Sequence, residues 1–365
     1  MALFKAVKKP VIRQGTQGGD VSSQRPRYSP KPSPCGAACP VAEDVRGWLT
    51  TIGDAEAEGR SNDQALEMAW QRITGRNPFP AVCGRVCSHP CEDHCHRSLK
   101  EGAVAIQEVE RLVGEFGIRR GLKFSKPRPL AAGVVVVGAG PAGLSAAYHL
   151  ARRGYAVTLL EKSPSPGGAM CSRSAESPLP ADVVDAEIGR ILDLGVVLRC
   201  DCEDIGVDQL RAEFKAVVLA LDSPDGAVAA GVFTACEAGD LSAVATAISN
   251  GLTAAEDADA YLRGASVQKP IARSSVGADC VKLSWYKESP RQQTVDGFTE
   301  LQAVEEAKRC MSCGMCMACG NCWMYCTSGG FEKLPKGRRY KLKLELCNGC
   351  KKCADSCPSG YIEMV

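Results

Sequence analysis

The feature that most constrains this 365-residue chain is a crowd of cysteines near its C-terminal end. Ten of the 21 cysteines lie between Cys310 and Cys357. The spacing C-x2-C-x2-C-x3-C occurs twice in that stretch. The two runs are Cys316, Cys319, Cys322 and Cys326, and then Cys347, Cys350, Cys353 and Cys357. Thiols at such short, fixed intervals converge on one loop, which is the arrangement that a metal centre requires.

The doubled run has the spacing of bacterial ferredoxins, in which three thiolates of one run share a cluster with the last thiolate of the other. One [4Fe–4S] cluster is therefore expected on Cys316, Cys319, Cys322 and Cys357, and another on Cys347, Cys350, Cys353 and Cys326. A zinc ribbon also uses C-x2-C, but it needs two pairs and not two runs of four. Cys310 and Cys313 stay open, as alternative ligands in a shifted register or as thiols near a partner. The cysteine spacing of residues 310–357 therefore predicts a protein that transfers single electrons.

The cysteine density also bears on the compartment. A disulfide scaffold this dense would be a short secreted chain. This chain shows no secretory apolar region after Met1 and no apolar run long enough to span a bilayer. Its net charge of +2, from 44 basic and 42 acidic residues, suggests no nucleic-acid partner. We expect a cytoplasmic protein of two or three domains, without membrane insertion.

The N-terminal third holds a second group of cysteines. Residues 1–34 are basic and rich in Gly, Ser, Gln and Pro, which predicts an extended arm, either flexible or docked on a partner. Helices are expected at residues 41–52 and 63–73, between the segments CGAACP and PFPAVCGRVCSHPCEDHCHR. The cysteines of these two segments are Cys35, Cys39, Cys83, Cys87, Cys91 and Cys95. Six cysteines in two groups favour an iron–sulfur site over a zinc site.

These two segments resemble the N-terminal iron–sulfur domain of the glutamate synthase small (beta) subunit, a domain that also opens dihydropyrimidine dehydrogenase. The resemblance implies a small helical domain with two [4Fe–4S] clusters, one of which has a carboxylate or amide as its fourth ligand. Carried over by position, the ligands of that cluster are Cys39, Cys87, Cys91 and Glu110, and two ligands of the second are Cys35 and Cys95. The C-x2-C pair that the family places just before Cys35 is absent. One N-terminal cluster is therefore expected, and a second only if Cys83 or an outside ligand completes it.

A dinucleotide-binding pattern follows a linker that contains two prolines. Residues 134–137 are four valines, which predict a buried strand. Gly138, Gly140 and Gly143 then form G-x-G-x-x-G, and Pro141 suits the first turn of a helix that runs to residue 152. Such glycines permit a tight turn and the close approach of a pyrophosphate, which the helix N-terminus attracts. A strand at 155–160 ends in Glu161, which is positioned to bind a ribose hydroxyl.

Three further features bear on which dinucleotide binds. Gly167 and Gly168 resemble the FAD half of flavoproteins with two dinucleotide domains. Only residues 223–231 stand where that family carries its nested nicotinamide domain, and no second G-x-G-x-x-G occurs. The segment GVFTACEAGD resembles the terminal flavin motif, with Glu237, or Asp240 if the loop slips, in place of the aspartate that holds the ribityl chain. The expected FAD site is Gly138, Gly140, Pro141, Ala142, Gly143, Glu161, Lys162, Gly167, Gly168 and Glu237.

The expected fold class is multidomain α+β. It combines a helical iron–sulfur N-terminal domain, a reduced Rossmann-like α/β domain that binds FAD, and a C-terminal domain like a bacterial ferredoxin. The expected boundaries are 1–34 for the extended arm, 35–125 for the helical [4Fe–4S] domain, 126–264 for the FAD-binding domain, 265–306 for a linker and 307–365 for the 2[4Fe–4S] domain. A strand is expected within residues 280–285.

The sequence shows no Ser/His/Asp set and no paired carboxylates in a Gly-rich cleft, so group chemistry is not indicated. It predicts an electron-transfer subunit of a larger oxidoreductase complex and not an enzyme in its own right. Such a subunit would relay electrons between a catalytic subunit and ferredoxin or a nicotinamide-reducing flavoprotein subunit. Two alternatives stay open. One is a stand-alone NAD(P)H:acceptor oxidoreductase or glutamate synthase small subunit, and the other is a structural iron–sulfur adaptor with an empty dinucleotide fold.

Overall fold

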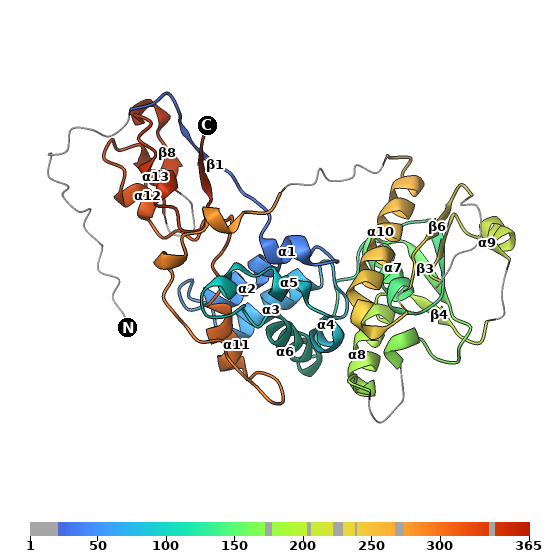
Figure 1. Cartoon of the computed structure of the whole chain (residues 1–365). Coiled ribbons are helices and arrows are strands. Elements are labelled where there is room, and N and C mark those ends of the chain that lie inside the picture. The colour runs from blue at the N-terminus through green and yellow to red at the C-terminus, as the bar shows by residue number, and fades with distance from the viewer. Residues whose placement is uncertain are drawn as a thin grey trace.

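The computed structural model describes residues 21–171, 177–202, 206–221, 229–237, 239–266, 274–335 and 340–365. These residues form three units that lie in a row (Figure 1). A helical unit stands in the middle, between a parallel-sheet unit and a small C-terminal unit. The order in space differs from the order along the chain, because residues 274–365, which follow the sheet unit in sequence, build one helix of the helical unit and then the C-terminal unit.

The helical unit is built on three amphipathic helices, α2 (Val45–Gly53), α3 (Asn62–Ile73) and α6 (Ile106–Arg119). The helices predicted at 41–52 and 63–73 are confirmed, although the first begins only at Val45, where the Asp44 carboxylate accepts the Gly47 amide as an N-cap. Three shorter helices carry cysteines: α1 (Pro34–Ala38), α4 (Pro80–Val86) and α5 (Pro90–Asp93). The buried core includes Trp48, Leu49, Ile52, Leu66, Ile73, Val109 and Phe116.

Two glycines bring α4 and α6 into backbone contact. A Cβ on Gly114 would lie 2.2 Å from the Ala81 nitrogen, and one on Gly84 would lie 2.4 Å from the Arg111 Cα. Only glycine permits so close an approach. The cysteines at and after α4 therefore lie beside the face of α6 that carries Glu110.

Helix α11 (Glu300–Ala307) belongs to the same core, although it comes late in the chain. Phe298, Ala303 and Ala307 pack with the core of α2 and α3. The predicted linker, residues 265–306, thus ends in a helix that completes the helical unit, because that helix has an apolar face to bury. The strand predicted within 280–285 is wrong. Two 3₁₀ turns, Ala278–Cys280 and Leu283–Trp285, take its place, and Val281 between them packs in one cluster with Met311.

The sheet unit contains five parallel strands in the order β4-β3-β2-β5-β6. The strands are β2 (Gly133–Val137), β3 (Ala156–Leu160), β4 (Val197–Arg199), β5 (Ala216–Leu219) and β6 (Val232–Thr234). The helices are α7 (Pro141–Arg152), α8 (Ala181–Leu192), α9 (Val207–Glu213) and α10 (Val244–Leu262). This alternation of parallel strands and helices confirms the predicted Rossmann-like α/β arrangement.

The two faces of this sheet are covered by different helices. Val134 and Val136 of the central strand pack with α7 and α10, whereas Val135 points to the opposite face and packs with Leu210 of α9. Helices α7 and α10 touch at Gly251, where a Cβ would lie 2.1 Å from the Ala142 oxygen. No helix in the described segments has both the length and the apolar character needed to cross a membrane.

The C-terminal unit consists of short elements around the cysteine loops. These are α12 (Asn321–Met324), α13 (Lys352–Asp355) and the strands β7 (Phe331–Glu332), β8 (Lys341–Leu342) and β9 (Ile362–Met364). Strand β1 (Pro26–Tyr28) pairs antiparallel with β9. The Tyr28 ring stacks on that of Tyr361 at 5.2 Å between centroids. The described part of the N-terminal arm is therefore extended, as expected, and it lies on the C-terminal unit of its own chain.

Candidate metal centres and dinucleotide site

Two cavities in the C-terminal unit are each lined by four cysteines. The first is lined by Cys316, Cys319, Cys322 and Cys357, and the second by Cys326, Cys347, Cys350 and Cys353. In each cavity three cysteines come from one run and the fourth from the other. The fold thus gathers the same quartets that the spacing predicts for two [4Fe–4S] clusters.

Each run curves around its cavity through residues with left-handed backbone. These are Ala318 (φ 55°) and Gly320 (φ 86°) in the first run, and Gly349 (φ 74°) and Lys351 (φ 63°) in the second. Alanine and lysine rarely adopt this conformation. It turns backbone amides toward the thiols, with Ala318 N 3.4 Å from Cys316 Sγ and Gly349 N 3.4 Å from Cys347 Sγ. Such N–H···S bonds stabilise an anionic sulfur, as a cluster ligand requires.

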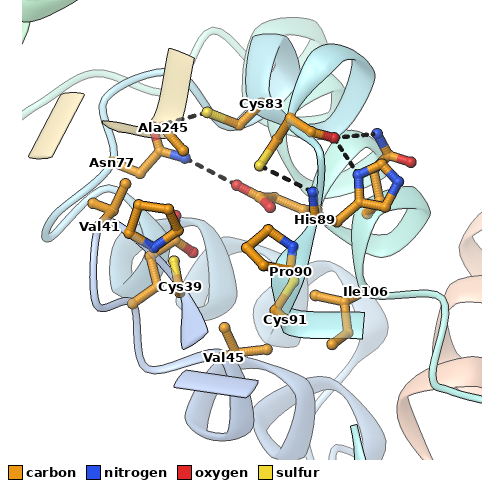
Figure 2. Close-up of a pocket in the computed structure, with 15 residues that line it drawn as sticks. Cys39, Val41, Val45, Asn77, Cys83, His89, Pro90, Cys91, Ile106 and Ala245 are labelled. Carbon is orange, nitrogen blue, oxygen red and sulfur yellow. Dashed lines mark hydrogen bonds between the residues drawn. The ribbon is translucent and has the colours of Figure 1, made fainter. Parts of the chain in front are cut away.

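A third cavity lies in the helical unit (Figure 2). Its lining includes the four cysteines Cys39, Cys83, Cys87 and Cys91, together with Glu110 of α6. Ala245 of α10 also lines it, so this cavity lies where the helical and sheet units meet. It contains the predicted set of Cys39, Cys87, Cys91 and Glu110, with Cys83 as a fifth candidate.

The Asn77 side chain forms hydrogen bonds with both Glu110 and Cys83, the two candidates for the fourth ligand. The Asn77 side chain donates to Glu110 Oε1 at 2.9 Å and accepts from the Cys83 thiol at 3.7 Å. In Figure 2 Cys83 lies toward one end of the cavity beside Asn77, while Cys39 and Cys91 lie toward the other. Burial raises the pKa of the Glu110 carboxyl, and the neighbouring Glu43 raises that pKa further. A buried carboxyl in such surroundings ionises readily only beside a cation, and an iron would supply one.

A fourth cavity lies between the helical unit and the C-terminal unit. Cys35, Cys95, Cys310 and Cys313 all line it, together with Arg46 and Arg97. Burial raises the pKa of the Cys310 thiol, and Cys35, Cys313 and Cys95 raise that pKa further because they lie close by. The sequence alone did not assign Cys310 and Cys313 to a cluster. The sequence feature that could have marked them as cluster ligands is their C-x2-C spacing, which the pairs Cys316–Cys319 and Cys347–Cys350 share.

Each of the four cavities contains at least one thiol whose pKa is raised by burial. Burial raises the pKa of Cys87 and Cys353 to about 11, and that of Cys313 and Cys322 to about 12. A metal cation offsets this cost when it replaces the proton. No three His, Cys, Asp or Glu side chains in the described residues are close enough to bind a single metal ion. A [4Fe–4S] cube holds each thiolate on a different iron, so its ligands surround a cavity and do not meet at one point.

The glycine-rich turn after β2 has the geometry of a dinucleotide fold. Gly138 has a φ of 97°, and a Cβ on Gly143 would lie 1.8 Å from the Gly138 oxygen. The Gly167–Gly168 loop lies across the same turn, since a Cβ on Gly168 would lie 3.0 Å from the Gly140 Cα. The Glu161 carboxylate accepts the amides of Ala139 at 2.6 Å and Ser163 at 2.8 Å. Pro141 and Ala142 begin α7 as predicted, and Lys162 is exposed.

Glu237 lies at the point where the pyrophosphate is expected. Its carboxylate accepts the Ala142 amide at 3.1 Å and the Gly143 amide at 3.2 Å. A Cβ on Gly140 would lie 2.5 Å from the same carboxylate. The side chain predicted to hold the ribityl chain therefore caps the N-terminus of α7, because a helix start attracts the nearest anion. A dinucleotide in this turn would displace it.

Comparison with known proteins shows which protein families two parts of this chain resemble. Residues 22–122 match the family model described as dihydropyrimidine dehydrogenase domain II, 4Fe-4S cluster. Residues 136–192 match the model of the NAD(P)-binding Rossmann-like domain. The two matches place an iron–sulfur domain before a dinucleotide-binding domain in this chain.

Three curated relatives show similarity over about half of this chain. The NAD-dependent dihydropyrimidine dehydrogenase subunit PreT of Salmonella typhimurium is 34% identical over 193 residues, which are 51% of this chain and 45% of that protein. The NADP(+)-dependent formate dehydrogenase subunit beta of Moorella thermoacetica is 34% identical over 214 residues, 52% and 29% of the two chains. The NADPH-Fe(3+) oxidoreductase subunit beta of Geobacter sulfurreducens is 32% identical over 195 residues, 52% and 28%. The chain thus spans less than half the length of each of these relatives.

Proposed function

We propose that this chain is an electron-transfer subunit of a larger oxidoreductase complex. It would carry FAD and [4Fe–4S] clusters and relay electrons between a catalytic subunit and ferredoxin or a nicotinamide-reducing subunit. The observation that carries the proposal is the position of the cysteine-lined cavities. One lies where the sheet and helical units meet, with Ala245 in its wall, and two lie in the C-terminal unit at the far end of the row.

The chain's own residues give each end of this row a role. When bound, [4Fe–4S] clusters exchange single electrons. The two C-terminal quartets would hold clusters within reach of a docked partner protein, because six of their eight cysteines are only partly buried. Cys39, Cys87, Cys91 and Glu110 would hold one against the sheet unit, with Asn77 orienting the carboxylate. The relatives named as subunits of dehydrogenases and of an Fe(3+) oxidoreductase are compatible with this role.

The turn at Gly138, Gly140 and Gly143 is proposed to hold FAD. Glycine at 140 leaves room for a pyrophosphate, and Glu161 stands at the end of β3, where a ribose is expected. The Gly167–Gly168 loop against Gly140 favours a flavin nucleotide. Because Glu237 lies on the Ala142 and Gly143 amides, binding would begin with the displacement of its carboxylate.

Two observations favour other functions. The model matched by residues 136–192 and the names of the three relatives mention NAD, NADP or NADPH, which favours a stand-alone NAD(P)H:acceptor oxidoreductase. The Glu237 carboxylate on the helix start favours an adaptor whose dinucleotide fold stays empty.

Anaerobically purified full-length protein separates the three functions. The relay predicts about 12 or more iron per chain, at four per cluster. It also predicts FAD in an acid extract, and reduction by dithionite or reduced ferredoxin but not by NADH or NADPH. Rapid bleaching by a nicotinamide would instead support the stand-alone enzyme, and a chain with iron but without flavin would support the adaptor.

A Gly140→Val variant tests the position of the flavin. The new side chain would meet the Glu237 carboxylate and fill the space of the pyrophosphate, so FAD should be lost while the iron stays. Gly189→Val is the matched control, because a Cβ at Gly189 on α8 meets nothing within 4 Å. Retention of FAD by Gly140→Val would mean that the flavin binds elsewhere. Glu237→Ala should tighten FAD binding if the carboxylate competes with it, and weaken FAD binding if the carboxylate holds the ribityl chain.

A further inference from the structure

The fourth cavity contains a quartet of cysteines that no spacing rule joins. Cys35 lies on α1 and Cys95 precedes the 3₁₀ turn His96–Leu99, while Cys310 and Cys313 follow α11. We propose that Cys35, Cys95, Cys310 and Cys313 bind a further [4Fe–4S] cluster between the helical and C-terminal units. The inference rests on the proposed function for the role of this cluster, but not for its ligands.

The backbone of the Cys310–Cys313 loop is the first argument. Ser312 has a φ of 50° and Gly314 a φ of 72°. In the two C-terminal runs the residues just before and just after the second cysteine are left-handed in the same way, Ala318 and Gly320 in one and Gly349 and Lys351 in the other. A left-handed serine is uncommon and needs a cause. The loop from Cys310 to Gly314 thus repeats the conformation of loops that line the other quartets.

The cavity is held rigidly by a buried ion pair beside it. Arg309 precedes Cys310, is almost completely buried and pairs with Glu306. Its guanidinium donates to the oxygens of Gly102 at 2.7 Å and Ala103 at 3.0 Å. The Glu306 carboxylate accepts the Ala105 amide at 2.8 Å. These contacts tie the Cys310 end of the loop to the segment that follows Cys95, so the two cysteine pairs keep their relative positions.

The charge of the lining also suits such a cluster. Four thiolates bring four negative charges, which the iron cube offsets only in part, and buried charge needs a compensating partner. Arg46 and Arg97 both line the cavity. The Arg46 guanidinium donates to the Cys313 carbonyl and, at 3.0 Å, to the Lys31 carbonyl, which fixes it beside the loop.

The cavity also occupies the place that a continuous relay needs. Ile106 lines both this cavity and the one that contains Cys39 and Glu110. At the other end, Cys313 is followed after two residues by Cys316, which lines the first C-terminal cavity. A cluster here would therefore join the helical-unit cavity to the two C-terminal cavities.

The test compares iron in the full-length, anaerobically purified chain with iron in two double variants. Cys310→Ser with Cys313→Ser should lower the count from about 16 to about 12 per chain, at four iron per cluster. Cys200→Ser with Cys202→Ser, a close pair that lines none of the four cavities, should stay at about 16. Cys35→Ser with Cys95→Ser should lose the same four, and the quadruple variant should lose no more. An unchanged count in Cys310→Ser with Cys313→Ser would overturn the proposal, as would one zinc ion in place of four iron.

A wild-type measurement decides the matter if the variants do not fold. Four [4Fe–4S] cubes per chain, counted from the Mössbauer spectrum of ⁵⁷Fe-loaded protein, support the proposal, and three or fewer overturn it. A failure of this proposal and a failure of the proposed function would give different results. A chain that holds three cubes and FAD would still fit the relay without this junction, whereas a chain without iron would remove both.

Discussion

Two cysteine-lined cavities lie within the C-terminal unit and two border the helical unit, and the two pairs are assembled in different ways. In the C-terminal unit all eight cysteines lie within residues 316–357, on two loops that exchange one cysteine each. In the helical unit the cysteines come from residues 35–95 and, for one cavity, from Cys310 and Cys313, while Glu110 of α6 lines the other cavity. Local loop conformation builds the first pair of cavities, whereas the packing of distant segments builds the second. The two pairs should therefore fail under different perturbations.

The largest effect is expected from Cys350→Ser. The variant removes one thiol from a quartet whose other three members stay in place, so about four iron should be lost and electron flow through the whole complex should stop. The partner's own reaction with an artificial dye should continue, because its chemistry is untouched. Cys280→Ser, outside all four cavities, is the control. Undiminished electron flow in Cys350→Ser would show that this cavity is not part of the relay.

Glu306→Leu should damage the helical unit and spare the C-terminal one. The variant leaves the buried Arg309 guanidinium with Glu101, at 3.8 Å, as its remaining acidic partner and the Ala105 amide without its acceptor, which costs up to about 3–5 kcal/mol of unfolding free energy. Glu305→Leu on the same helix removes an exposed pair with Lys308 and should cost less than about 1 kcal/mol. Chemical denaturation measures both values. If the Glu306→Leu variant lost iron from all four cavities together, the C-terminal and helical pairs of cavities would not be independent.

A smaller effect should separate Glu110 from Cys83 within one cavity. Glu110→Ala should lose the cluster of the helical unit, or alter its electron paramagnetic resonance signal, because a ligand is removed. Cys83→Ser should keep both iron and signal, since the Cys83 thiol is engaged with Asn77 and a serine hydroxyl can donate to the same oxygen. The reverse result would make Cys83 the fourth ligand. The iron count and the spectrum of the reduced protein decide.

The smallest effect, over the range from pH 7 to 5, concerns the contact between the sheet and helical units. The ring of His149 on α7 donates to the Arg76 carbonyl at 2.9 Å, and burial lowers its pKa to about 3. The unfolded chain binds a proton at this histidine near pH 6.5 and the folded chain does not. Stability should therefore be full above about pH 6.5 and fall as the pH drops toward 3, by up to about 1.4 kcal/mol per pH unit. Between pH 7 and 5, chemical denaturation of His149→Gln should therefore show a shallower loss of stability than that of wild type.

Much of the fold follows from local pattern. The valine run, the glycines after it and the helix that Pro141 begins predict the central strand and turn of the sheet unit, and the structure has them. Helix α11 and strand β1 are different. Nothing near either segment says that α11 packs on α2 or that β1 pairs with β9, because the apolar faces that they cover lie hundreds of residues away.

The sequence by itself determined the two C-terminal quartets and the glycine turn, because fixed spacing in a short loop leaves few places for a side chain to go. Only the tertiary structure decided that Cys310 and Cys313 lie with Cys35 and Cys95, and that Glu237 rests on the amides of Ala142 and Gly143. In both cases the partners are far apart in the chain. They are brought together by buried contacts, such as those of Arg309 and Glu306, that exist only once the units have packed.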